Sequence, residues 1–138
     1  IEKFFHFHKK GPNNAYSFYV HPLGNFGVGQ GADGFAINTN YLEGIYDFYE
    51  KVVKDYNELF LHDDLWISFF LYFIKNNKIL SLQEHLEKDS LGKPSLIYDS
   101  HIDSPGLISN YGKNLNEAVN RRDEIALKSL KYMINKVK

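Results

Sequence analysis

Residues 65–74 restrict the fold of this chain more than any other feature, because they read Leu-Trp-Ile-Ser-Phe-Phe-Leu-Tyr-Phe-Ile. A helix of this composition has almost no polar face, and a helix that is apolar all round belongs in the interior of a protein. Two carboxylates, Asp63 and Asp64, stand directly before it. Acidic residues rarely lie next to a core unless they cap a helix, pair with a cation or take part in chemistry.

The acidic pair has two interpretations. An aspartate at the start of a helix accepts hydrogen bonds from backbone N–H groups and meets the positive end of the helix dipole, so the pair could simply stabilise the helix. The same two effects keep a carboxylate ionised, which suits a general base near neutral pH. The spacing alone is compatible with both interpretations.

The length and composition of the chain narrow its class. With 138 residues it can form one domain with a real core, so we expect a single domain over residues 1–138. The aromatic content of 16% favours a globular fold over a disordered tail. The net charge of −1, with scattered lysines, gives no electrostatic footprint for nucleic acid, so we expect no nucleic-acid partner. Cysteine is absent, which excludes disulfides and thiolate metal sites.

The sequence also bears on location and completeness. No apolar run is long enough to span a membrane and no signal peptide is evident, so we expect a cytoplasmic protein. The chain starts at Ile1 without a methionine and enters a strand-like run at once. We therefore expect it to be the C-terminal part of a larger domain whose N-terminal half precedes it.

Hydrophobic periodicity predicts an α/β fold with a mixed sheet and packed helices. Strands are expected at residues 5–8 and 16–20, paired as a hairpin, and at residues 34–37 and 78–82, whereas the glycine-rich residues 22–34 are expected to form loops. Helices are expected at residues 40–56 (capped by Asn38 or Thr39), at residues 63–76, and from a cap at Asn114 or Asn116 to residue 137. The first helix is expected to bury Leu42, Ile45, Tyr46, Tyr49, Val52, Val53 and Tyr56, and the last Val119, Leu127, Leu130, Ile134 and Val137.

A second candidate site is the segment Gly31-Ala32-Asp33-Gly34. A strand is expected after it, whereas a phosphate loop or dinucleotide fingerprint leads from a strand directly into a helix. The segment offers backbone that a ligand can approach closely and one carboxylate, Asp33. Taken alone, it is interpreted as a set of tight turns.

The order of these parts changes that interpretation. Gly31-Ala32-Asp33-Gly34-Phe35 is followed by a strand, an amphipathic helix and then Asp63-Asp64-Leu65-Trp66-Ile67-Ser68. This series resembles the C-terminal half of the GT-A nucleotide-sugar glycosyltransferases, especially small family-two-like enzymes of bacteria and large DNA viruses. The resemblance covers residues 29–82 and implies a GT-A-like (Rossmann-like) partial domain.

The resemblance also implies a function and roles for residues. The chain would transfer a sugar from a nucleotide-sugar donor to a hydroxyl of a glycan or another acceptor, with inversion of the anomeric centre. Asp64 matches the position of the general base and Asp63 would support it, while Gly31, Ala32, Asp33 and Gly34 would border donor and acceptor. Trp66 could stack on a sugar ring, or serve the core.

The cofactor and two alternatives remain to be tested. GT-A enzymes usually hold Mg²⁺ or Mn²⁺ with an Asp-x-Asp motif, which this chain does not contain. Since some of them use a late histidine as a further metal ligand, His101 is a candidate for that role; the other interpretation is a plain loop histidine. The chain could instead be a non-catalytic sugar-binding or scaffolding domain derived from the same fold, or an unrelated domain whose acids only cap a helix.

Overall fold

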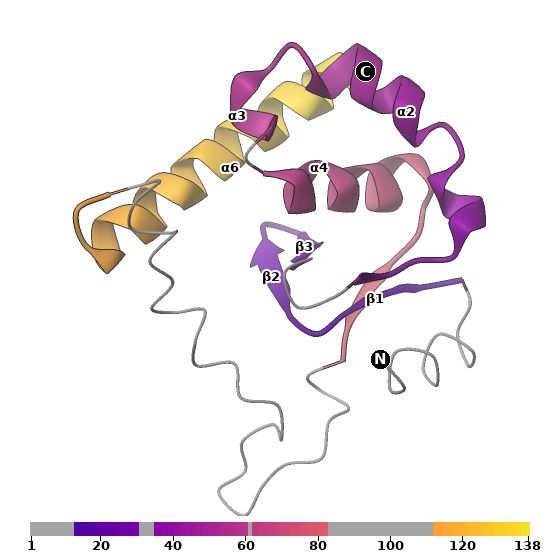
Figure 1. Ribbon diagram of the computed structural model, residues 1–138, viewed down its shortest axis with the longest axis horizontal. Coiled ribbons are helices and arrows are strands. Elements are labelled where there is room, and N and C mark those ends of the chain that lie inside the picture. The colour runs from indigo at the N-terminus through magenta and orange to yellow at the C-terminus, as the bar shows by residue number, and fades with distance from the viewer. Residues whose placement is uncertain (1–12, 31–34, 61, 83–111) are drawn as a thin grey trace, which may run out of the picture.

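A computed structural model describes residues 13–30, 35–60, 62–82 and 112–138 of the chain. They form a mixed α/β fold with a small mixed sheet and packed helices, as the sequence predicts. In Figure 1 the helices lie together on one side of the strands, and the long C-terminal helix α6 (Leu115–Val137) runs past the start of α4 (Asp63–Phe69). The strands are short, so the helices supply most of the buried side chains.

The mixed sheet has three strands. β1 (Ala15–Ser17) lies between β4 (Phe35–Ala36) and β5 (Ile79–Ser81), antiparallel to β4 and parallel to β5. A parallel pair needs a long crossover connection, and here the connection from β1 to β5 contains the helices α2 to η4. The strands predicted near β4 and β5 are confirmed. Both edges of β1 are occupied by these strands, and its predicted hairpin partner, residues 5–8, lies outside the described residues.

The structure contains a hairpin that the sequence analysis missed. β2 (Val20–Leu23) pairs antiparallel with β3 (Phe26–Gly29), so the loop predicted for residues 22–34 is wrong over this part. Gly24, with φ of 62°, opens the two-residue turn between the strands. A glycine in the left-handed region at the first turn position is typical of tight hairpins, because the twist of such turns matches that of the strands.

The single helix predicted for residues 40–56 is divided in the structure. A 3-10 helix, η2 (Thr39–Leu42), is separated by Gly44 from α2 (Ile45–Phe48), which continues as the π-helical η3 (Tyr49–Val53). Gly44 has φ of 81°, a left-handed conformation that interrupts a right-handed helix. The break changes the direction of the chain between η2 and α2 (Figure 1).

The start of this helical region is confirmed, but its buried face is only partly as predicted. The Asn38 side chain accepts a hydrogen bond from the Asn40 backbone N–H at 3.1 Å, which is the predicted cap. Val52 and Val53 are buried as expected. Phe48 is also buried, whereas Tyr46 is 71% exposed, so its predicted place in the core is wrong. The physical reason is the helical spacing itself: counted from Ile45 in steps of three and four, the face that packs on the core contains Phe48 and Val52, and Tyr46 lies off it.

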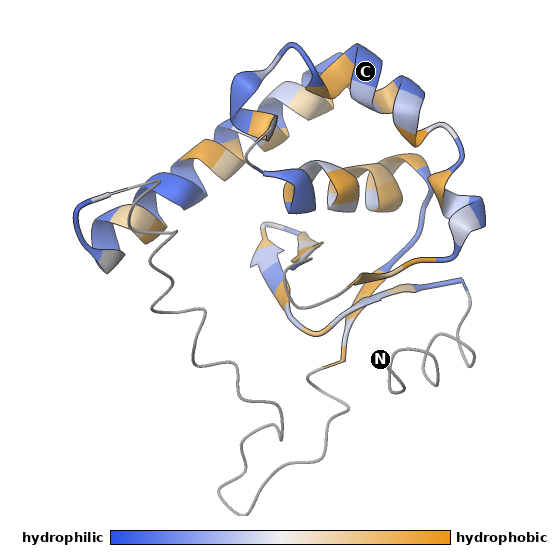
Figure 2. Ribbon diagram, viewed as in Figure 1, coloured by the Kyte–Doolittle hydropathy of each residue, from blue (hydrophilic) through white to orange (hydrophobic). Residues whose placement is uncertain are grey.

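The helix predicted after the acidic pair is confirmed. α4 (Asp63–Phe69) continues without a break as the π-helical η4 (Phe70–Ile74), and the short α3 (Asn57–Phe60) precedes it. The helical region ends before Asn76, whose φ of 51° is left-handed. Figure 2 shows α4 as hydrophilic at its start and hydrophobic beyond. The expected burial holds for Leu65 and for Phe69 to Leu71 but is wrong for the end of the run, where Tyr72, Phe73 and Ile74 are exposed.

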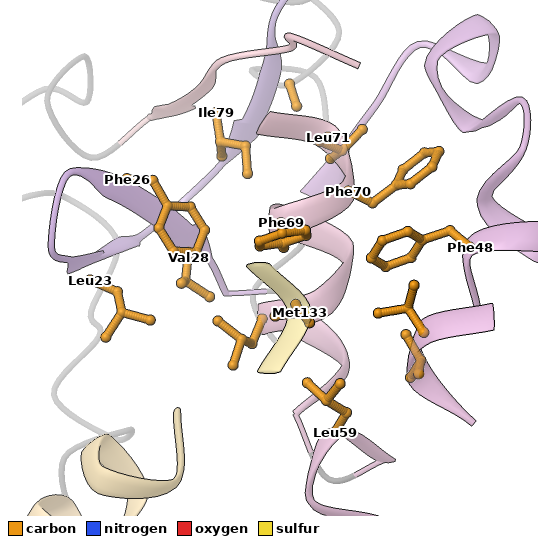
Figure 3. Close-up of a cluster of buried hydrophobic side chains, with 14 residues drawn as sticks. Leu23, Phe26, Val28, Phe48, Leu59, Phe69, Phe70, Leu71, Ile79 and Met133 are labelled. Atoms are coloured by element: carbon orange, nitrogen blue, oxygen red, sulfur yellow. The ribbon is translucent and has the colours of Figure 1, made fainter. Parts of the chain in front are cut away.

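The core is built around Phe69, whose side chain is fully buried. Figure 3 shows it between the β2–β3 hairpin, which contributes Phe26 and Val28, and Phe48 on the opposite side. The Phe48 and Phe69 rings are stacked with centroids 5.9 Å apart. Truncation of such a side chain to alanine typically costs about 3–5 kcal/mol, so α4 is fixed firmly in the fold.

The last helix, α6 (Leu115–Val137), starts where predicted. The Asn114 side chain accepts a hydrogen bond from the Glu117 backbone N–H at 3.0 Å. Its buried face differs from the predicted stripe, because Leu127 and Val137 are exposed. Leu130 and Ile134 pack against the core as predicted, and the fully buried residues of the helix are Ala118, Ser129 and Met133. The centre of the buried face is thus formed by Ala118, Ser129 and Met133. Leu127 and Val137, which were predicted to lie on this face, lie outside it.

No helix in the described ranges of the chain is long and apolar enough to cross a membrane.

Candidate active site

The acidic pair lies in the first turn of α4. His62 is the residue before the helix and makes no side-chain capping bond, although its backbone oxygen accepts from the Leu65 N–H at 3.0 Å. The exposed Asp63 side chain accepts a hydrogen bond from the Asp64 backbone N–H at 2.9 Å. Asp63 therefore satisfies one of the free N–H groups at the helix start, from the first helical position rather than from the cap position. The Asp64 side chain is half-buried.

Ser68 connects this helix to the glycine-rich segment, which is the predicted turn at residues 31–34. It lies one helical turn after Asp64 on the same face of α4, because residues four apart are neighbours on a helix surface. Its buried hydroxyl oxygen accepts a hydrogen bond from the Gly29 backbone N–H at 3.0 Å. Gly29 is the last residue of β3, two residues before Gly31. The chain that leads into the predicted turn is thereby bound to the helix that starts with the acidic pair.

Both ends of the glycine-rich segment are held by β1. The Ser17 hydroxyl donates to the carbonyl oxygen of Tyr19 at 2.9 Å or of Gln30 at 3.0 Å, and the Gln30 N–H donates to the Tyr19 carbonyl at 3.0 Å. At the other end, Phe35 pairs with Ser17 in the sheet. A Cβ atom at Gly29 would lie 2.5 Å from the Phe35 ring, so any side chain there would displace the ring from its present position.

The four residues predicted to border the ligand, Gly31, Ala32, Asp33 and Gly34, lie outside the described residues. Their neighbours on both sides are placed by the contacts above. The structure therefore fixes where the segment begins and ends relative to α4, and the roles of the four residues remain predictions.

Trp66 is half-buried and lies one turn after Asp63. Its indole packs against the Tyr49 ring, with centroids 5.7 Å apart, at the margin of the hydrophobic core. The side chain thus serves the core on one side and leaves part of its surface to solvent. This arrangement is compatible with both roles expected from the sequence.

Two histidines and an ion pair lie near the start of α4, and the sequence analysis did not find them. His21 on β2 is 3.9 Å from Asp123 on α6, measured from Nε2 to Oδ1. Arg122 donates two hydrogen bonds to the same Oδ1, from Nε at 3.0 Å and from Nη2 at 2.8 Å. No sequence signal could have brought them together, because they come from distant segments that meet only in the fold.

Both imidazoles are shifted toward the neutral form. Burial lowers the pKa of His62, the Arg122 guanidinium lowers it further, and Asp63 opposes these effects. Burial and then Arg122 likewise lower the pKa of His21, against an opposing effect of Asp123. Burial first and the Arg122 guanidinium second thus favour the neutral form of both histidines.

The predicted divalent cation has no complete ligand set among the residues that the structure describes. No group of three or more His, Asp or Glu side chains in these ranges could hold a metal ion. The predicted ligand His101 lies outside them, so Mg²⁺ or Mn²⁺ binding stays a prediction.

Comparisons with models of protein families, with curated proteins and with solved structures found no match to this chain. The resemblance to GT-A glycosyltransferases therefore rests on the sequence motifs alone.

Proposed function

We propose that the chain is the acceptor-side part of a GT-A-like glycosyltransferase, which moves a sugar from a nucleotide-sugar donor to an acceptor hydroxyl. The observation that carries the proposal is the hydrogen bond from the Gly29 N–H to Ser68 Oγ. It ties the two segments that resemble the family, which are far apart in the sequence. A sugar-transfer site needs both, because one borders the ligands and the other supplies the base.

The proposed chemistry uses one carboxylate. The Asp64 carboxylate takes the proton of the acceptor hydroxyl while the oxygen of that hydroxyl attacks the anomeric carbon. The new bond joins that oxygen to the anomeric carbon, and the bond from the anomeric carbon to the donor phosphate breaks. The nucleoside diphosphate leaves with the electron pair, and the anomeric centre is inverted.

The other predicted residues would bind and orient. Asp63 is exposed beside the base and can accept hydrogen bonds from sugar hydroxyls with the carboxylate oxygens that the helix leaves unused. The partly exposed face of Trp66 offers a surface for a sugar ring. Gly31, Ala32, Asp33 and Gly34 would border the donor and acceptor.

The test is the Asp64→Asn substitution, which removes the base and keeps the shape of the side chain. The full-length gene product that contains these residues is prepared as wild type, as Asp64→Asn and as the matched control Asp55→Asn, an exposed acid outside the site. Each is incubated with a panel of nucleotide sugars, sugar acceptors and Mg²⁺ or Mn²⁺. Release of nucleoside diphosphate is measured, together with folding by circular dichroism. We expect turnover to fall by about 10²–10⁴-fold in Asp64→Asn alone, the contribution typical of a general base.

A sugar-binding module is the second candidate, and the half-buried Trp66 with its Tyr49 neighbour favours it. Aromatic surfaces bind sugars without any chemistry. In that case wild type binds sugars but releases no nucleotide, and Asp64→Asn leaves binding unchanged. That outcome would contradict the enzyme proposal.

A further inference from the structure

The second half of α6 carries a row of lysines on its outer side. Leu127, Lys128, Lys131 and Lys138 are all exposed. They lie three, four or seven residues from Lys131, so they share one face of the helix, which we call the lysine face. Met133, on the opposite side of α6, is fully buried in the core. The lysine face is thus the side of this helix that the fold does not use.

The charge of the lysine face is not balanced by nearby acids. No aspartate or glutamate follows Glu124 in the chain, and none of the three lysines forms an ion pair with a described residue. One turn earlier, the charges of the exposed Arg121 and Glu124 cancel. Of the elements that pack on α6, η3 carries Glu50, which is bound to Lys54 at 2.6 Å, and α3 carries the single exposed acid Glu58. A net positive charge therefore remains.

Apolar side chains lie among these lysines. Leu127 is 46% exposed within the lysine face, and Val137, beside its end, is 40% exposed. An anionic lipid surface engages both kinds of side chain, because its headgroups attract the ammonium groups and the boundary below them accepts aliphatic side chains. A nucleic acid would engage the lysines through its phosphates and leave the aliphatic side chains in water.

We propose that the lysine face docks the chain on an anionic lipid surface, with α6 lying in the plane of that surface. From Lys128 to Lys138 the row is about 15 Å long, at 1.5 Å per helical residue. A straight row of this length along one helix face fits a flat surface and reaches several headgroups. The proposal does not depend on glycosyl transfer.

The expected attachment is weak and reversible. Each lysine next to an anionic bilayer increases the partition coefficient roughly fivefold. The three lysines together therefore give a preference of about a hundredfold for anionic over neutral lipid. Since exposed charges are screened by salt, this preference should decrease as the ionic strength rises.

The experiment is co-sedimentation of the full-length gene product with two kinds of vesicle at low and at physiological ionic strength. One kind contains phosphatidylcholine alone, and the other contains phosphatidylcholine mixed with phosphatidylserine. We expect the wild type to bind the mixed vesicles far more strongly than the neutral ones, and added salt to weaken this binding.

Variants test whether the lysine face carries the binding. Lys128→Gln with Lys131→Gln should lower the partition into the mixed vesicles by about 25-fold. The matched control, Lys78→Gln with Lys113→Gln, removes the same charge from exposed lysines outside this face and should keep the binding. Only exposed side chains are replaced, so folding, checked by circular dichroism, should be unchanged.

Leu127→Gln distinguishes a lipid surface from other polyanions. It should lower the partition about fivefold, because roughly half of a leucine side chain is available to the bilayer. The proposal is overturned if the wild type does not distinguish the two kinds of vesicle, or if the control pair loses as much binding as the pair on the lysine face. It is also overturned if duplex DNA binds in place of the vesicles and Leu127→Gln leaves that binding unchanged.

Discussion

Ser68 is the residue on which the proposed site depends most directly, because its hydroxyl joins the acidic helix to the glycine-rich segment. Ser68→Ala would leave the buried Gly29 N–H without an acceptor, which typically costs about 1–3 kcal/mol. We expect this loss in the free energy of unfolding, measured by urea denaturation.

Ser129 provides the matched control for that substitution. It is also a fully buried helical serine, but its hydroxyl has no hydrogen-bond partner among the described residues. Ser129→Ala removes an unsatisfied polar group, so we expect stability to stay the same or to increase. Equal losses in both variants would show that the hydrogen bond of Ser68 contributes nothing specific.

At the residue scale, the sequence predicts the role of those side chains that bond to neighbouring backbone. The caps at Asn38 and Asn114 and the first-turn place of the acidic pair follow from side chains that bond to nearby backbone, and all were predicted. The contacts of Ser68 with Gly29 and of His21 with Asp123 join distant segments. Neither the composition of the chain nor the spacing of its residues predicts such contacts.

At the scale of elements, the β2–β3 hairpin is the main correction. Leu23-Gly24-Asn25-Phe26 is a two-residue turn signal between apolar residues, so a signal was present. It was hidden by the many neighbouring glycines, which favour loops. α4 was predicted correctly because a long apolar run leaves few alternatives, whereas the division of the preceding helix at Gly44 depends on one glycine.

The turn of this hairpin can be tested at Gly24. Its φ of 62° is left-handed and a Cβ there would meet no atom within 4 Å, so only backbone conformation opposes a side chain. We expect Gly24→Ala to lower the free energy of unfolding by about 1–2 kcal/mol. Gly24→Asn should cost less, because asparagine adopts this conformation more readily. Thermal unfolding of both variants checks the order; a fully tolerated alanine would contradict the assigned turn.

At the scale of the whole molecule, the pairing of the strands determines where the candidate site lies in the fold. The parallel pair of β1 and β5 encloses the segment from the hairpin to η4, so the glycine-rich segment and α4 are both part of one crossover connection. The sequence predicted the α/β class because helical and strand periodicities alternate. It could not predict the strand order, which depends on pairings between distant short strands.

The most direct test of the central claim, that the glycine-rich segment and the acidic helix form one sugar-nucleotide site, is a map of amide chemical shifts. The chain is titrated with uridine and guanosine diphosphate sugars, with and without Mg²⁺, and each amide signal is followed. We predict that one ligand shifts the signals of residues 29–35 and 63–68 together, with the same dissociation constant. Shifts confined to one of the two segments, or none with any ligand, would contradict the claim.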